Sequence, residues 1–254
     1  MVAKVNSRLA FLCVSLLLWA QPALTRADTI TVAVAANFAP TLRLLAERFQ
    51  HEQAHQVRVV TGSSGLLAAQ ILHGAPYDLF YSADTSKPQA LIDAGLAPAQ
   101  NRYTYAIGRL VLWSAQAKLV DAQGRVLHTD FQRLALANPK LAPYGLAALD
   151  VLTALKLSDA TRTRWVMGEN IAQTYQFVAT GNADLGFIAL AQWQAEPNTG
   201  SHWLVPSTLH RAIRQDALLL HDTPANRAFW QFMRSASAQE QIRRAGYDTP
   251  EIKP

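Results

Sequence analysis

Two junctions between an expected strand and an expected helix, near the start of the chain, constrain the fold most strongly. In the first, the apolar run 31–36 meets Asn37, and Pro40 suits the first turn of a helix. In the second, the strand-like residues 59–60 lead through the small residues 61–65 into another helical pattern. Neither junction contains Lys, Arg or His. Because helix N-termini carry unpaired N–H groups and the positive end of the helix dipole, two that converge would form an anion site without cationic side chains.

The alternation of short apolar runs with amphipathic runs predicts the fold class of the first part of the chain. Strands are expected at 29–36, 57–60 and 77–81, and each is followed by a helical pattern. The third helix, 86–94, ends before Gly95, a residue typical of helix C-termini. This order of strands and helices predicts a parallel sheet covered by helices, with right-handed crossovers.

The pattern then changes, because two extended runs, 103–107 and 110–113, are separated only by Gly108 and Arg109. We interpret this as a crossing into a second lobe. Further strands are expected at 134–137, 184–190, 203–205 and 213–220, and further helices from Tyr144 onward and at 170–178, 226–234 and 238–245.

These elements predict an α/β fold of two lobes, each a mainly parallel sheet flanked by helices. Lobe I is expected to comprise 28–108 and 216–254, and lobe II 109–215. The chain would cross between the lobes near Gly108 and again near Ile213, and the C-terminal helices would return to lobe I. Hinge motion at the two crossings would open and close the space between the lobes.

The first 27 residues resemble a secretory signal peptide. Lys4 and Arg8 precede an apolar run at 9–20, and the small-residue site 25–27 suits cleavage. A retained membrane anchor is the less favoured alternative, because this run is well short of the ~20 residues that span a bilayer. We therefore expect an exported protein that resides in the periplasm.

The composition of the expected mature chain excludes several functions. The one cysteine, Cys13, lies in the signal peptide, and the bulky Leu12 before it argues against lipidation. Disulfides and thiol nucleophiles are therefore not expected. Without Lys4, Arg8 and Arg26 the formal net charge falls from +5 to +2. Because the remaining cations are scattered, nucleic acid is not an expected partner.

Four segments without a charged residue suit the place where a ligand would bind. They are 35–41, 61–70, 141–149 and 170–178. In open α/β sheets, ligands bind at the carboxyl ends of the strands, where helix N-termini gather. Four such N-termini around one enclosed dianion could replace a salt bridge. A site of this kind favours a fully ionised anion, since a bound O–H group would find no acceptor.

Several motifs closely resemble those of the periplasmic molybdate-binding proteins of ABC importers. They are the runs 32–38, 62–65, 70–71, 74–84 (Gly-Ala-Pro-Tyr-Asp-Leu-Phe-Tyr-Ser-Ala-Asp), and 138–139 together with 143–145. The resemblance implies a two-lobed class II periplasmic binding protein that is not an enzyme and needs no cofactor. Its ligand would be molybdate or tungstate, and its partner a membrane ABC permease. We also expect a monomer.

The resemblance also implies which residues contact the oxyanion. Asn37 would contribute its backbone N–H and side-chain amide, and Ser64 its N–H and hydroxyl, with Ser63 as the alternative register. Tyr144 and Ile171 would contribute backbone N–H groups. The metal atom would thus be held only through its oxygens, with no direct metal-cation ligand from the protein.

One position departs from part of the family. Where some members have a tyrosine whose hydroxyl reaches the anion, this chain has Ala189. The hydroxyl of Tyr144 is the substitute that the resemblance offers.

Other interpretations of the same residues remain open at this point. Asn37 and Ser64 could be ordinary helix N-caps, and Tyr144 could merely pack between the lobes. Asp78 and Asp84 are interpreted as structural carboxylates, with Asp84 capping the helix that follows.

Other functions receive less support from the sequence. A hydrolase built on Ser64, His73 and Asp84 would lack the Gly-x-Ser-x-Gly elbow, and the His residues lie singly. A secreted adhesion module would not need four neutral helix starts. Binding of another tetrahedral oxyanion, such as sulfate, is the main alternative.

Overall fold

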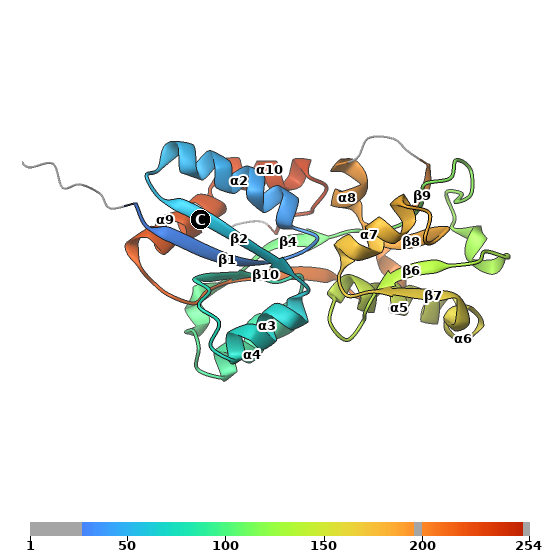
Figure 1. Ribbon diagram of the computed structural model, residues 1–254, viewed down its shortest axis with the longest axis horizontal. Helices are drawn as coiled ribbons and strands as arrows, with labels where there is room; N and C mark the ends of the chain where they lie inside the picture. Colours follow the sequence, from blue (N-terminus) through green and yellow to red (C-terminus); the bar gives the residue numbers. More distant parts are fainter. Residues whose placement is uncertain (1–26, 196–199, 251–254) are drawn as a thin grey trace, which may run out of the picture.

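The computed structural model describes residues 27–195 and 200–250, which form two lobes joined side by side (Figure 1). The expected signal peptide, 1–27, lies outside the described residues except for Ala27. Within 27–195 and 200–250, no helix combines the length and the apolar character needed to cross a membrane.

Lobe I is built on a five-stranded sheet in the order β2-β1-β3-β10-β4. Its strands are β1 (Thr29–Ala35), β2 (Gln56–Gly62), β3 (Leu79–Tyr81), β4 (Arg102–Gly108) and β10 (Ile213–Leu219). β1 pairs in parallel with β2 and β3, whereas β10 runs antiparallel to β3 and β4. The expected parallel unit is therefore present, and the strands at the crossings add antiparallel pairs to it.

Helices cover both faces of this sheet because its strands are apolar on both sides. Its helices are α2 (Ala39–Glu52), α3 (Ser64–Leu72), α4 (Ser86–Asp93), α9 (Pro224–Arg234) and α10 (Ala236–Arg244). Val32 and Val34 of β1 face α2, α9 and α10, while Ala33 faces the opposite cluster with Leu67 and Leu91 of α3 and α4. This alternation follows from the two-residue period of a strand.

Lobe II repeats this plan with the order β7-β6-β8-β5-β9. Its strands are β5 (Leu110–Ser114), β6 (Leu134–Ala137), β7 (Trp165–Gly168), β8 (Leu185–Ala189) and β9 (Ser201–Leu204), and its helices are α5 (Pro143–Ala154), α6 (Ser158–Thr161), α7 (Ile171–Ala179) and α8 (Leu190–Ala195). Here too β6 is parallel to β7 and β8, and β5 is antiparallel to β8 and β9. The prediction of two α/β lobes is confirmed, and both sheets are mixed.

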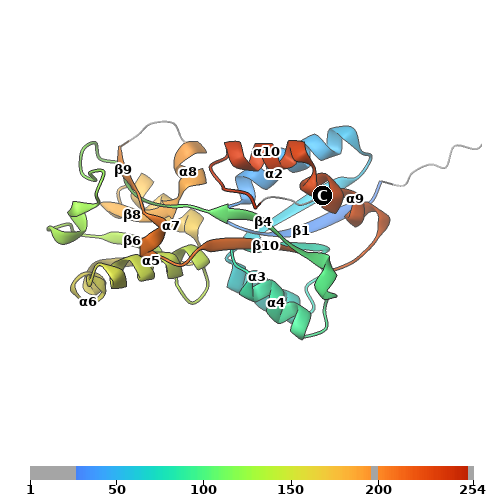
Figure 2. The ribbon, with the colours of Figure 1, turned by 180° about the vertical axis from the view of Figure 1, so that it is seen from behind.

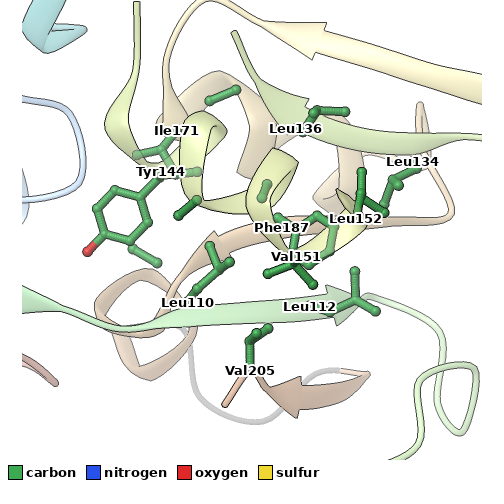
Figure 3. Packing of buried hydrophobic residues seen from close by; sticks show 14 of the residues in the cluster. Leu110, Leu112, Leu134, Leu136, Tyr144, Val151, Leu152, Ile171, Phe187 and Val205 are labelled. Atoms are coloured by element: carbon green, nitrogen blue, oxygen red, sulfur yellow. The ribbon is translucent and has the colours of Figure 1, made fainter. Parts of the chain in front are cut away.

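The core of lobe II lies between its sheet and α5 (Figure 3). Leu110 and Leu112 of β5 point into this cluster, where Val151 and Leu152 of α5 meet them. The alternate residues of β5 face α7 on the other side of the sheet.

Two segments that lie side by side carry the chain between the lobes (Figure 2). β4 ends at Gly108 and β5 begins at Leu110, while the return from β9 ends where Ile213 of β10 pairs with Gly108. The helices α9 and α10 then pack on lobe I, as the sequence indicated.

One strand was missed by the sequence analysis. The four residues of β7 form an edge strand that pairs only with β6 in the described sheet, and Met167 is 44% exposed. Half-exposed residues at a sheet edge give no run of apolar residues by which a short strand could be recognised.

Candidate functional site

A small cavity between the lobes brings together every residue that the sequence analysis assigned to the anion. Lobe I and lobe II contribute about equally to its walls, which are formed by Ala35, Ala36, Asn37, Ser63, Ser64, Ala83, Ala142, Pro143, Tyr144, Asn170 and Ile171. None of these residues is charged. The space open to the centre of a water-sized sphere is about 10 Å³, about what one water molecule needs, so the cavity is narrow.

The strands and helices explain why these residues meet. β1 and β2 end at the cavity, and α3 begins there at Ser64. In lobe II, β6 leads to the start of α5 at Pro143, and β7 leads to the start of α7 at Ile171. The carboxyl ends of parallel strands thus place helix N-termini around one point, as the sequence analysis expected.

The backbone N–H groups of the four predicted residues have no hydrogen-bond acceptor within the described part of the chain. Ser64 and Ile171 are the first residues of their helices, and Tyr144 is the second residue of α5, so none has an acceptor within its own helix. These three N–H groups also have no backbone or side-chain acceptor outside the helices among 27–195 and 200–250. The N–H of Asn37 has no acceptor there either. Four unpaired donors therefore line a cavity with no cationic side chain.

Both serines of the second junction line the cavity. Ser63 is the N-cap residue of α3, but its side chain makes no capping bond, and its buried Oγ lacks a hydrogen-bond partner. The Oγ of Ser64 accepts the N–H of Ala83 at 2.9 Å, which leaves its own O–H able to donate. Ser63 and Ser64 therefore remain alternatives for the hydroxyl contact with the anion.

The side chain of Asn37 belongs to a buried network and does not cap α2, whose N-cap is Phe38. Its Nδ2 donates to Gln215 Oε1 at 2.8 Å and to Tyr247 Oη at 3.3 Å. Tyr247 in turn donates its hydroxyl to the carbonyl of Asn37 at 2.8 Å. Because its side-chain nitrogen has these partners, the free donor of Asn37 at the cavity is its backbone N–H.

Tyr144 both lines the cavity and packs in the core of lobe II. Its ring lies at the edge of the apolar cluster, with the hydroxyl pointing away from that cluster (Figure 3). The hydroxyl accepts the Nε2–H of Gln215 at 3.4 Å. Burial raises the pKa of the Tyr144 hydroxyl well above its usual value, so the group stays protonated and neutral.

Ala189 is fully buried in β8 and does not line the cavity. Its N–H donates to Gln192 Oε1 at 3.0 Å, and Gln192 Nε2 donates to the carbonyl of Ile171 at 3.1 Å. The side chain of Gln192 therefore links the start of α7 to the end of β8.

Asn170 was missed by the sequence analysis as a capping residue. Its Oδ1 accepts the N–H groups of Ala172 and Gln173 at 3.0 and 3.1 Å. This cap satisfies the next two donors of α7 and leaves that of Ile171 unpaired. An Asn directly before an apolar helical pattern is the signal by which the cap could have been found.

The two candidate carboxylates have structural partners. Asp78 accepts the N–H of Thr31 at 2.7 Å and the Nδ2–H of Asn226 at 3.1 Å. Asp84 accepts the N–H of Lys87 at 3.0 Å and forms an ion pair with its ammonium group. Both interactions match the structural interpretation.

The hydrolase alternative is not supported by the geometry. Ser64 and His73 lie at opposite ends of α3, and His73 Nδ1 contacts the carbonyl of Ala69 at 2.7 Å. Asp84 is paired with Lys87. In 27–195 and 200–250 there is also no group of three His, Cys, Asp or Glu residues that could hold a metal ion.

A two-lobed α/β protein with a small, donor-lined cavity between its lobes has the architecture of a solute-binding protein. The model of the family described as bacterial extracellular solute-binding protein matches residues 30–248. This chain therefore belongs to that family.

Relatives and a solved structure agree with this assignment. The molybdate-binding protein ModA of Azotobacter vinelandii is 44% identical over 228 residues, which cover 87% of this chain and 90% of the relative. ModA of Rhodobacter capsulatus is 41% identical over 226 residues, covering 88% and 89%. The solved structure of the Azotobacter vinelandii periplasmic molybdate-binding protein matches with a TM-score of 0.84 and 42% identity, over 87% of this chain and 100% of that one. The family resemblance seen in the motifs is thus confirmed.

Proposed function

We propose that this protein is exported to the periplasm, captures molybdate or tungstate between its lobes, and delivers the anion to a membrane ABC permease. The relatives named as molybdate-binding proteins, at 41–44% identity over most of the chain, support the ligand class. The protein would act as a monomer and as a carrier, without catalysis, cofactor or nucleic acid.

The observation that carries the proposal is the set of unpaired N–H groups at Asn37, Ser64, Tyr144 and Ile171. Three of them, at Ser64, Tyr144 and Ile171, lie in the first turn of a helix, so each adds the positive end of a helix dipole, worth ~0.3–2 kcal/mol per interaction with an anion. A hydroxyl from Ser64, or from Ser63 in the alternative register, would add a further charge-assisted hydrogen bond.

The walls of the cavity favour a compact, fully ionised oxyanion. Backbone N–H groups and hydroxyls supply donors, whereas the apolar walls from Ala35, Ala36 and Ala142 supply no acceptor. A tetrahedral dianion can take up several donors at once, and the limited space leaves no room for an organic substituent.

The direct test is a calorimetric titration of residues 28–254 with molybdate, tungstate, sulfate and phosphate, followed by thermal unfolding with each anion. We expect molybdate and tungstate to bind most tightly and to raise the melting temperature, because a ligand that binds only the folded state stabilises it. Tighter binding of sulfate would assign the protein to another oxyanion. No heat and no stabilisation with any of the four would refute the proposal.

A further inference from the structure

A buried glutamine on the second crossing contacts the anion-facing segments of both lobes. Gln215 lies in β10 and is fully buried. A shift in register between Gln215 and Asp216 interrupts the pairing of β10 with β4 at this point. Such irregularities redirect a side chain out of the regular alternation of a strand.

The hydrogen bonds of Gln215 divide between the lobes. Its Oε1 accepts Asn37 Nδ2–H at 2.8 Å and the hydroxyl of Tyr105 at 3.0 Å, both from lobe I. Its Nε2 donates to Tyr144 Oη of lobe II at 3.4 Å. Asn37 Nδ2 can only donate, so the atom of Gln215 that it meets is the oxygen, and the amide nitrogen is directed at lobe II.

Gly108 makes room for this contact on the first crossing. A Cβ at this position would lie 2.1 Å from Tyr144 Oη and 2.8 Å from Gln215 Nε2. No other residue type could therefore occupy position 108 without displacing the tyrosine hydroxyl or the glutamine amide. Since Gly108 pairs with Ile213, the contact lies between the two crossings that join the lobes.

The hydrogen bonds that Gln215 makes with Asn37, Tyr105 and Tyr144 join uncharged groups, and of these three bonds the one with Tyr144 crosses between the lobes. Burial raises the pKa values of Tyr105 and Tyr144 well above the usual value, so both hydroxyls stay protonated. The bonds from Asn37 and Tyr105 to Gln215 lie within lobe I and would survive separation of the lobes. The bond to Tyr144 would not.

We propose that Gln215 is a positioning residue for the anion site, which holds Asn37 of lobe I and Tyr144 of lobe II in register when the lobes meet. Gln215 is not one of the residues that line the cavity, but it contacts two that do, Asn37 and Tyr144. By favouring the closed arrangement it raises the apparent affinity of the N–H donors, since affinity scales with the fraction of binding-competent molecules. This inference rests on the proposed function for its ligand.

The test compares Gln215→Met, which removes the amide at similar volume, with Tyr105→Phe as the matched control. Tyr105 contacts the same Oε1 from within lobe I and has no contact with lobe II through its hydroxyl. We expect Gln215→Met to raise the dissociation constant for molybdate about tenfold, mainly through faster release, and Tyr105→Phe to leave it within about twofold. The double variant Gln215→Met/Tyr144→Phe should bind no more weakly than Gln215→Met, because both changes remove one shared contact.

A second measurement needs no ligand. Residues 28–254 contain no cysteine, so spin labels can be placed on cysteines introduced at the exposed positions Glu47 of α2 and Gln176 of α7. We expect Gln215→Met to shift the distribution of label distances towards longer values, and Gly108→Ala to do the same by displacing the Tyr144 hydroxyl. If Gln215→Met fails to fold, Gly108→Ala decides the question.

The two proposals fail in different ways. If the unmodified protein does not bind molybdate, the proposed function is wrong, while a longer label distance in the variants would still support the positioning role. If molybdate binds and Gln215→Met changes neither the release rate nor the label distances, the positioning role is refuted. Equal effects of Gln215→Met and Tyr105→Phe would also refute it, because the loss would then not depend on contact with lobe II.

Discussion

The N–H of Gly65, in the first turn of α3, donates a 2.9 Å hydrogen bond to the carbonyl of Leu141, which lies in the loop before α5. This bond joins the lobes directly beside the cavity, next to Ser64 on one side and Ala142 on the other. Its donor is one of the first-turn N–H groups of α3, which have no acceptor within the helix. The contact between the lobes therefore satisfies one such donor, whereas the adjacent N–H of Ser64 has no acceptor within the described residues.

The approach of Gly65 to Leu141 predicts that Gly65→Ala will weaken anion binding. An added Cβ would lie 3.0 Å from the Leu141 carbonyl oxygen and 3.1 Å from its Cα, and both are backbone atoms that must move apart. We expect a three- to tenfold rise in the dissociation constant, which corresponds to about 0.7–1.4 kcal/mol. Within the helix itself Ala is favoured over Gly by up to about 1 kcal/mol, so the ligand-free protein should be no less stable. Calorimetry and thermal unfolding check the two halves of this prediction, and unchanged affinity would contradict it.

Removal of the hydroxyl in Ser64→Ala is expected to weaken molybdate binding by ~1–3 kcal/mol, the value of a lost charge-assisted hydrogen bond. It should also lower the free energy of unfolding by about 1 kcal/mol, because the Ala83 N–H loses its acceptor.

The matched comparison is Ser63→Ala. Its buried Oγ has no partner, so the change should cost the ligand-free protein little stability. Calorimetric titration of both variants then settles the register. An affinity loss confined to Ser63→Ala would transfer the hydroxyl contact to Ser63.

The gathering of helix N-termini at one cavity could be predicted from the sequence because its causes are local. A strand that ends before a helix start places unpaired N–H groups at one edge of a parallel sheet, and 36–38, 61–65 and 141–145 each show this pattern within a few residues. That all these segments line one cavity follows from the topology of two similar sheets.

The side-chain network could not be predicted, because its partners are far apart in the sequence. Gln215 and Tyr247 lie 178 and 210 residues from Asn37, and nothing near either residue indicates such a contact. The sequence around Gln215 predicts only an extended strand, since the irregular pairing that redirects its side chain depends on β4. The family resemblance implied that the side-chain amide of Asn37 contacts the anion, and in the structure its nitrogen donates to Gln215 and Tyr247.

A site that offers donors and few acceptors should discriminate against protonated oxyanions. Phosphate retains a proton near neutral pH, and its O–H would find few acceptors in the cavity, at a cost of ~1–3 kcal/mol. We therefore expect phosphate to bind at least tenfold more weakly than molybdate at pH 7. Competition calorimetry with molybdate already bound measures this difference. Comparable affinities for the two anions would mean that an acceptor faces the cavity when a ligand is present.

The carboxyl group of Asp216, next to Gln215, should make the stability of lobe I depend on pH. Burial raises the pKa of Asp216, although the hydrogen bond from Thr104 at 2.7 Å and the positive charge of Arg102 act in the opposite direction. A raised pKa means that the folded protein binds more protons than the unfolded chain, so the free energy of unfolding should fall as the pH rises through the range between the unfolded and folded values. Asp216→Asn keeps an acceptor for Thr104 and removes this titration. We expect its stability relative to the unmodified protein to be higher at pH 7 than at pH 4, as measured by urea unfolding.

Asp150 provides the control with the opposite sign. Burial acts to raise its pKa, but hydrogen bonds from the N–H and guanidinium of Arg211 outweigh burial and lower it. The stabilisation from this pair should therefore be present above the ordinary carboxyl pKa and disappear as the pH falls. Asp150→Asn should cost more stability at pH 7 than at pH 4, whereas Asp216→Asn should show the reverse trend. If both variants showed the same pH dependence of stability, the cause would be a general effect of removing a negative charge. That result would contradict the opposite pH dependences that we attribute to Asp216 and Asp150.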